Sequence, residues 1–164
     1  MTRGPVRTAR GWLLIAGAGS AAILAGALGS QFIGGLTPCP ICIWQRWPHV
    51  AAMVIAALAV TVPWRQIRPL AVLGVLTMLA GAGIGLYHTG IERGWWEGPD
   101  TCTSSDITGL SVDQLMARIM SAPLVRCDEV QWDLLGLSMA SWNALISLGL
   151  AALWLAAAVR APGR

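Results

Sequence analysis

Acidic residues are confined to one window of this 164-residue chain. No Asp or Glu occurs outside residues 92–133, and all eleven basic residues are arginines. Charged residues make up 12% of the chain, against about a quarter in a soluble domain, and 55% of the residues are hydrophobic. This pattern predicts several membrane spans and one polar loop. Although the net charge is +3, the same distribution argues against a nucleic-acid-binding protein.

Four apolar runs are long enough to cross a lipid bilayer. They cover about residues 12–33, 42–62, 70–88 and 134–159. About 20 helical residues, at about 1.5 Å each, cross a hydrocarbon core of about 30 Å. The sequence therefore predicts an all-α membrane protein, with residues 1–164 forming a single integral domain. The expected fold is a four-transmembrane-helix bundle.

The arginines predict how this bundle is oriented. Only three lie in the loop at about 89–133, with Arg46 just inside the membrane. Seven flank the opposite ends of the spans, namely Arg3, Arg7, Arg10, Arg65, Arg68, Arg160 and Arg164. Because Lys and Arg accumulate in cytoplasmic segments, we expect a multi-pass inner-membrane protein with both termini in the cytoplasm. The loops at about 34–41 and 89–133 would then be periplasmic. A secretory signal peptide is the alternative interpretation of the first run, which is longer than a usual signal core.

The second periplasmic loop carries the pattern of a short helix. Ser111 and Gln114 have the spacing of a capping box. Apolar residues then recur at helical spacing, at Val112, Leu115, Met116, Ile119 and Met120. We expect a short amphipathic helix in the membrane interface, with packing against the loop itself as the alternative.

All four cysteines fall on the predicted periplasmic side, where disulfides persist. Cys39 and Cys42 form a Cys-x-x-Cys pair at the start of the second run, and Cys102 and Cys127 lie in the polar loop. Three interpretations remain open: two structural disulfides, a zinc site of four cysteines, and a thiol–disulfide relay. A ring as small as Cys39–Cys42 restrains little of the chain, and the spacing between the pairs matches zinc sites weakly. We therefore favour the relay.

Charged and titratable residues near Cys42 indicate what such a relay would serve. Cys42 lies in the first turn of a helix starting near Pro40, where the helix N-terminus favours a thiolate. Arg46 follows four residues later on the same face, where it could hydrogen-bond a quinone oxygen and stabilise its negative charge on reduction. Snorkelling to the surface is its alternative role. His49 and His88 are candidates for passing protons to a quinol, with ordinary packing as the alternative for each.

Taken together, these motifs resemble the DsbB family of bacterial membrane oxidoreductases. The resemblance rests on residues 38–46, on the loop cysteines, and on residues 131–139 at the start of the last run, and it covers nearly the whole chain. It implies a protein-disulfide oxidoreductase that reoxidises a periplasmic DsbA-like thiol oxidase. The electron acceptor would be ubiquinone or menaquinone, and no metal is implied. The activity would sustain disulfide bond formation.

The resemblance also implies roles for individual residues. Cys102 would be attacked by the reduced DsbA-like protein, with Cys127 as its disulfide partner. Cys39 would receive the electrons from this loop pair, and Cys42 would face the quinone. Arg46 matches the family arginine beside the quinone ring.

The chain departs from the family pattern at three places, one of which is Pro40 between the two cysteines. Better-known members often carry a glutamate where this chain has Gln45, and the family pattern Tyr-x-His appears here as Tyr87-His88, with His88 retained as a quinone-site candidate.

A vitamin-K-epoxide-reductase-like oxidoreductase would place the two cysteine pairs in the reverse order. The alternative from another class is a non-catalytic membrane subunit whose two structural disulfides brace its periplasmic loops.

Overall fold

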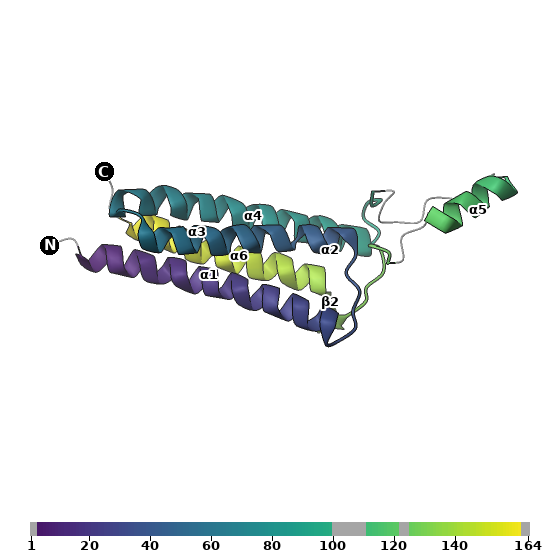
Figure 1. The fold of residues 1–164 in the computed structure, drawn as a ribbon, viewed down its shortest axis with the longest axis horizontal. Helices are drawn as coiled ribbons and strands as arrows, with labels where there is room; N and C mark the ends of the chain where they lie inside the picture. The colour runs from purple at the N-terminus through teal and green to yellow at the C-terminus, as the bar shows by residue number, and fades with distance from the viewer. Residues whose placement is uncertain (1–2, 100–110, 122–124, 162–164) are drawn as a thin grey trace.

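The fold is given by a computed structural model that describes residues 3–99, 111–121 and 125–161. Its main elements are long helices lying side by side (Figure 1): α1 (Arg3–Phe32), α2 (Pro40–Trp44) continued by α3 (Arg46–Thr61), α4 (Ile67–Glu92) and α6 (Met139–Arg160). Within these residues, the helical segments long and apolar enough to cross a membrane are Thr8–Phe32, Pro40–Thr61, Trp64–Glu92 and Met139–Arg160. The predicted fold of four membrane-spanning helices is therefore confirmed.

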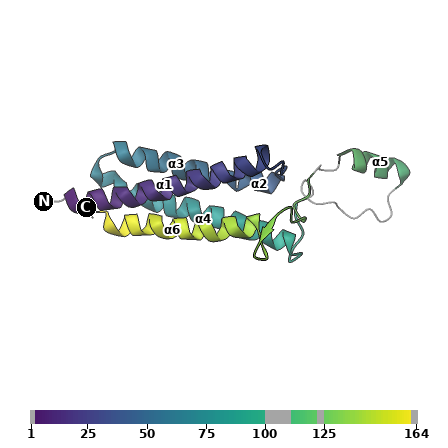
Figure 2. The same cartoon turned by 90° about the horizontal axis from the view of Figure 1, so that it is seen from below.

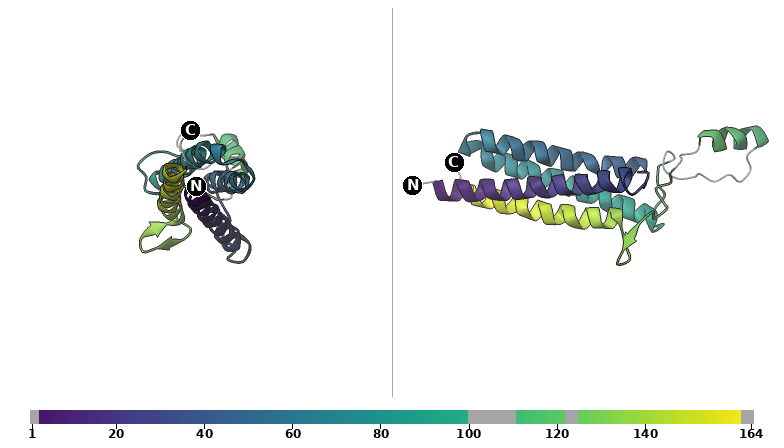
Figure 3. Two further views of the ribbon diagram at one scale, coloured as in Figure 1. Left: turned by 90° about the vertical axis from the view of Figure 1, so that its left-hand side faces the viewer. Right: turned by 60° about the horizontal axis from the view of Figure 1, so that its bottom comes forward.

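The two ends of the bundle differ in what they carry. The start of α1, the end of α6 and the short 3₁₀ turn η1 (Trp64–Gln66) between α3 and α4 lie together at one end (Figures 1 and 3). At the opposite end α1 turns into α2, and α4 leads toward α6. We call this the cysteine end, because Cys39 and Cys42 lie there.

The bundle core is made of small residues that let the helices approach closely. The most extensive packing joins α4 to α6. A Cβ atom placed on Gly85 of α4 would lie 3.0 Å from the backbone nitrogen of Ala144 in α6. Many large apolar side chains point outward instead, among them Leu14, Ile15, Val54, Leu76 and Leu155. Helices that are apolar on all sides suit a bilayer, which solvates their outer faces.

Replacing Gly74 by alanine is expected to destabilise the bundle. A Cβ there would lie 2.1 Å from the Trp154 ring, which is fully buried, so the ring must move. Overpacking of this kind costs about 1–3 kcal/mol. Gly83→Ala in the same helix is the control, since nothing lies within 4 Å of its added Cβ. Thermal unfolding in detergent should show a lower midpoint for Gly74→Ala only; equal midpoints would contradict this packing.

The last membrane helix starts later than the sequence predicted. The apolar run begins near residue 134, but β1 (Asp133–Leu134) and β2 (Leu137–Ser138) pair as an antiparallel hairpin. The two residues between them, Leu135 and Gly136, have φ values of 56° and 75°. Positive φ at both central positions is typical of a tight two-residue hairpin turn and cannot continue a right-handed helix. Helix α6 therefore begins at Met139.

The predicted amphipathic helix is present as α5 (Val112–Ser121, Figure 2). Its capping box forms as expected: the Ser111 N–H donates to Gln114 Oε1 over 3.0 Å, and the Gln114 N–H donates to Ser111 Oγ over 3.4 Å. Val112, Met116 and Met120 are exposed. Its location in the membrane interface remains a prediction.

Candidate active site

The Cys-x-x-Cys pair forms the start of the second span. Cys39 is the N-cap of α2, with Pro40 in the first turn, and the Cys42 N–H donates to Cys39 Sγ over 3.2 Å. An N-cap acceptor satisfies one of the free N–H groups of a helix, and an ionised sulfur does so best. The sequence predicts this stabilisation for the Cys42 thiolate, whereas in the structure the N–H of Cys42 points to Cys39.

The two thiols interact directly. Both are free, and their sulfur atoms lie 2.8 Å apart in hydrogen-bonding contact. This hydrogen bond lowers the pKa of Cys39 to about 5 against the opposing effect of burial, with further help from His88 and from the Cys42 N–H. The lowered pKa favours the thiolate at Cys39, the sulfur that also accepts the Cys42 N–H.

Titration of the reduced protein should show one thiolate with an unusually low pKa. The ultraviolet absorbance of thiolate should rise with a midpoint near pH 5, whereas an ordinary cysteine titrates near about 8.5. Because the pKa is lowered, the charge is present above this midpoint and is lost as the pH falls through it. The variant Cys39→Ser should lack the step. A reduced protein with no thiolate below pH 8 would contradict the assignment.

His88 connects the cysteine pair to the polar loop. Its Nε2 lies 3.6 Å from Cys39 Sγ and 3.2 Å from the backbone oxygen of Cys127, and its Nδ1 lies 2.8 Å from Gln45 Nε2. An amide nitrogen only donates, so Nδ1 accepts and the proton resides on Nε2, facing Cys39. Helix α4 continues one turn past His88 to Glu92, whose carboxylate lies 3.9 Å from Nε2.

Cys127 packs against the same site. It is fully buried and forms a cluster with Cys39, Ile41 and Ile91. Cys127 is disulfide-bonded, and Cys102 lies outside the described residues. The structure thus places three of the four predicted catalytic cysteines in contact with one another or with His88.

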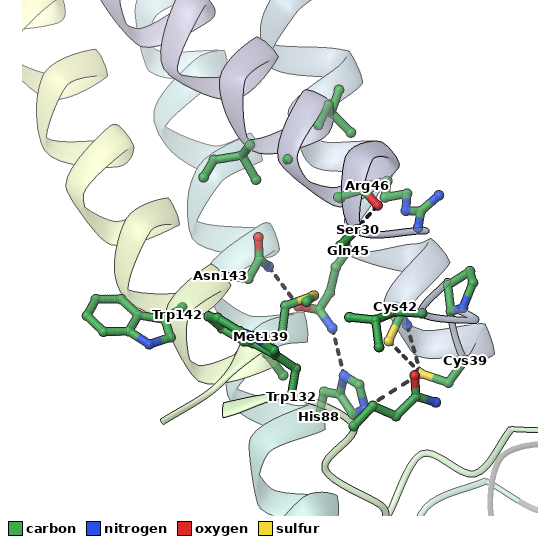
Figure 4. A pocket seen from close by; sticks show the side chains of 18 of the residues that line it. Ser30, Cys39, Cys42, Gln45, Arg46, His88, Trp132, Met139, Trp142 and Asn143 are labelled. Carbon is green, nitrogen blue, oxygen red and sulfur yellow. Dashed lines mark hydrogen bonds between the residues drawn. The ribbon is translucent and has the colours of Figure 1, made fainter. Parts of the chain in front are cut away.

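A cavity of about 470 Å³ opens beside the pair, between α1, α3 and α6 (Figure 4). Its walls are mostly apolar, and the polar side chains that line it include Cys39, Cys42, Gln45, Arg46, His49, His88 and Asn143. Arg46 donates from Nη1 to Gln31 Oε1 of α1 over 2.8 Å. An apolar cavity of this size with a few convergent polar groups is typical of a small-molecule site.

Sequence reasoning missed part of the polar lining. Asn143 Nδ2 donates to Gln45 Oε1 over 2.8 Å, and Asn143 Oδ1 lies 2.9 Å from His49 Nε2. In the sequence, Gln45 is a departure from the family pattern, and no motif points to Asn143. Its signal in the sequence was an amide inside an apolar span, since polar residues there tend to be functional.

The geometry also bears on the zinc alternative. The ligand atoms of Cys39, Cys42 and His88 lie within 4.8 Å of one another, close enough to share an ion. A structural zinc site needs four ligands, and Cys127 cannot supply a thiolate while it is in a disulfide. The zinc alternative with all four cysteines as ligands is therefore incompatible with the disulfide at Cys127. We interpret the cluster as a redox pair with its histidine.

These features define a class: a multi-pass membrane protein with a Cys-x-x-Cys pair beside an apolar cavity. The family model described as "Disulfide bond formation protein DsbB" matches residues 9–157. The disulfide bond formation protein B of Methylococcus capsulatus is 39% identical over 142 residues, covering 80% of this chain and 83% of that protein. That of Dechloromonas aromatica is 32% identical over 152 residues, covering 87% and 88%. An uncharacterized protein of Rickettsia prowazekii, RP370, is 29% identical over 123 residues, covering 73% and 70%.

The chain therefore belongs to the DsbB family. This membership supports a redox role in disulfide bond formation.

Proposed function

We propose that this protein is a thiol:quinone oxidoreductase that reoxidises a periplasmic DsbA-like dithiol protein. Electrons would enter at the loop cysteines, Cys102 and Cys127, and pass to Cys39 and Cys42. The observation that carries the proposal is the packing of Cys127 against Cys39 beside His88. This contact gives the loop pair a route to the Cys-x-x-Cys pair.

The lowered pKa of Cys39 suits the last thiol–disulfide step below, in which Cys39 is the leaving group. Exchange begins when a thiolate attacks a disulfide sulfur, and reactivity depends on the thiolate fraction. In the proposed sequence, a thiolate of the reduced partner attacks Cys102, which frees Cys127. Cys127 then attacks the Cys39–Cys42 disulfide at Cys39, and Cys42 leaves as a thiol. The second partner thiolate displaces Cys102 from the mixed disulfide, and Cys102 in turn displaces Cys39 from Cys127.

The cavity fits the ring of a quinone. Its apolar walls suit a lipid-soluble ring, and Cys42 and Arg46 both line it. We propose that Arg46 holds one ring oxygen, with Gln31 orienting the guanidinium through its 2.8 Å hydrogen bond. A bound quinone supplies a two-electron, two-proton acceptor. The overall exchange balances: two partner thiols become a disulfide, and the quinone becomes a quinol.

The proposed location follows from the same reaction. With the cysteine end facing the periplasm, the loop pair meets soluble thiol proteins in an oxidising compartment. The arginines at the other end of the bundle would then lie in the cytoplasm, as the positive-inside rule requires. Ubiquinone and menaquinone both fit this description, and the partner is identified by its reduced Cys-x-x-Cys chemistry.

Catalytic turnover tests this proposal. The purified protein would be mixed with a reduced DsbA-like protein and short-chain ubiquinone or menaquinone, and quinone absorbance would be followed. We expect quinone consumption that depends on both proteins, with one disulfide formed in the partner per quinol. A folded protein that reduces neither quinone would contradict the function and favour the structural-disulfide alternative.

A further inference from the structure

A chain of four hydrogen-bonded side chains leads from Cys39 into the apolar bundle. His88 Nε2 faces Cys39 Sγ, His88 Nδ1 contacts Gln45, Gln45 contacts Asn143, and Asn143 contacts His49 (Figure 4 shows the first three links). The links from His88 to His49 measure 2.8, 2.8 and 2.9 Å. Three helical segments contribute to the chain. Such a network is expensive among apolar residues unless each group is satisfied.

The two amides give the chain a direction. An amide nitrogen only donates and an amide oxygen only accepts. Gln45 donates from Nε2 to His88 and accepts at Oε1 from Asn143 Nδ2. Asn143 Oδ1 must then accept from His49 Nε2. Every donor in the chain points toward Cys39, so His49 carries its proton on Nε2 and its Nδ1 is an acceptor.

That acceptor has no partner in the described part of the protein. His49 is 1% exposed, and its Nδ1 makes no hydrogen bond to any described residue. His49 also lines the cavity that Arg46 and Cys42 line. A buried acceptor without a donor is costly, and a ligand that brings a hydroxyl group to this wall of the cavity would satisfy it after a small shift of the His49 ring.

We propose that His49 accepts a hydrogen bond from a hydroxyl of the quinol, and that Asn143 and Gln45 act as positioning residues that keep His49 in the accepting tautomer. This inference rests on the proposed function, in which the cavity holds the ring. A quinol has two hydroxyls that can donate, whereas the oxidised ring has only carbonyl oxygens, which cannot. The hydrogen bonds from His49 to His88 therefore make the cavity bind quinol more tightly than quinone, as long as His88 donates to Cys39.

Binding of the two redox forms tests this inference without turnover. In a Cys42→Ser background, where no Cys39–Cys42 disulfide can exchange electrons with the ring, decylubiquinone and decylubiquinol would be titrated separately. Quenching of tryptophan fluorescence reports binding, because Trp132 and Trp142 line the cavity. We expect His49→Phe to weaken quinol binding about ten-fold, the effect of one lost hydrogen bond, and to change quinone binding less than about two-fold.

A second variant addresses the chain itself. Asn143→Leu keeps the side-chain size and removes both links, so it should reduce the preference for quinol as His49→Phe does. Ser147→Ala, one turn further along α6, is the control. Ser147 is buried but takes no part in the hydrogen-bonded row from Cys39 to His49, and its hydroxyl has no partner among the described residues. Helical circular dichroism and the thermal unfolding midpoint in detergent verify folding of each variant.

The outcomes separate this inference from the proposed function. If the background protein binds neither ring form, the proposed function fails and the inference fails with it. If it binds both forms, and His49→Phe changes both affinities equally or neither, the inference is overturned and the proposed function stands. Loss of quinol preference in both variants, with Ser147→Ala unchanged, supports the inference.

Discussion

Replacing Cys42 by serine is expected to abolish quinone reduction. Electrons leave the thiol pair as it closes into a disulfide, and serine cannot form one with Cys39. The rate should fall at least about a thousand-fold, as expected for loss of a residue on which covalent catalysis depends. The fold should survive, because serine is close in size to cysteine and the Cys42 thiol is free, so no structural disulfide is lost. Quinone absorbance with a reduced DsbA-like partner measures the loss.

The same variant separates the enzyme from the structural alternative. Gly83→Ala, which adds a methyl group to open space, serves as the control and should turn over normally. In Cys42→Ser, partner oxidation should stop once the loop disulfide has been used, leaving Cys39, Cys102 and Cys127 as thiols, detectable by mass spectrometry of alkylated peptides. Normal turnover in Cys42→Ser together with a lowered unfolding midpoint would instead support a protein whose cysteines only brace its loops.

Replacing Arg46 by methionine is expected to weaken the use of quinone. A hydrogen bond from a charged donor contributes about 1.5–3 kcal/mol, which corresponds to about a ten- to hundred-fold rise in KM for quinone. The apolar stem of methionine keeps much of the side-chain packing, so the effect should reside in the lost guanidinium. Steady-state rates over a range of quinone concentrations, at saturating partner, measure KM and kcat separately.

Two companion variants make the Arg46 prediction specific. Gln31→Leu removes the neutral acceptor that orients the guanidinium over 2.8 Å, so it should raise KM by a smaller factor. Arg68→Met, at the other end of the bundle, should leave KM unchanged. An unchanged KM in Arg46→Met would show that Arg46 only reaches toward the membrane surface, and it would remove the arginine from the proposed site.

The fold could be predicted because the signals for it are local. Each span needs only a long apolar run, and the capping box of α5 needs two residues three positions apart. The start of α6 could not be predicted in the same way. Residues 134–137 are Leu-Leu-Gly-Leu and appear as a continuous apolar run. Only the positive φ of Leu135 and Gly136 shows that they form a hairpin turn.

The site was predictable to the extent that it depends on short spacing. Cys39, Cys42 and Arg46 fall within one helical segment, so their proximity follows from the sequence. The contact between Gln45 and Asn143 joins residues 98 positions apart, and no local pattern indicates it. Likewise, the sequence predicts the N-terminus of α2. It does not show which sulfur accepts from the N–H groups there, because that depends on the N-cap geometry of Cys39.

A single-turnover reaction tests the central claim most directly, namely that the Cys39–Cys42 pair itself reduces a quinone. A variant with Cys102→Ser and Cys127→Ser leaves this pair as the only thiols of the chain. The reduced variant would be mixed with one equivalent of ubiquinone without oxygen, and thiols and quinol would be counted. We predict one quinol formed and two thiols lost per chain. Unchanged quinone with both thiols retained, in a folded protein, would contradict the claim.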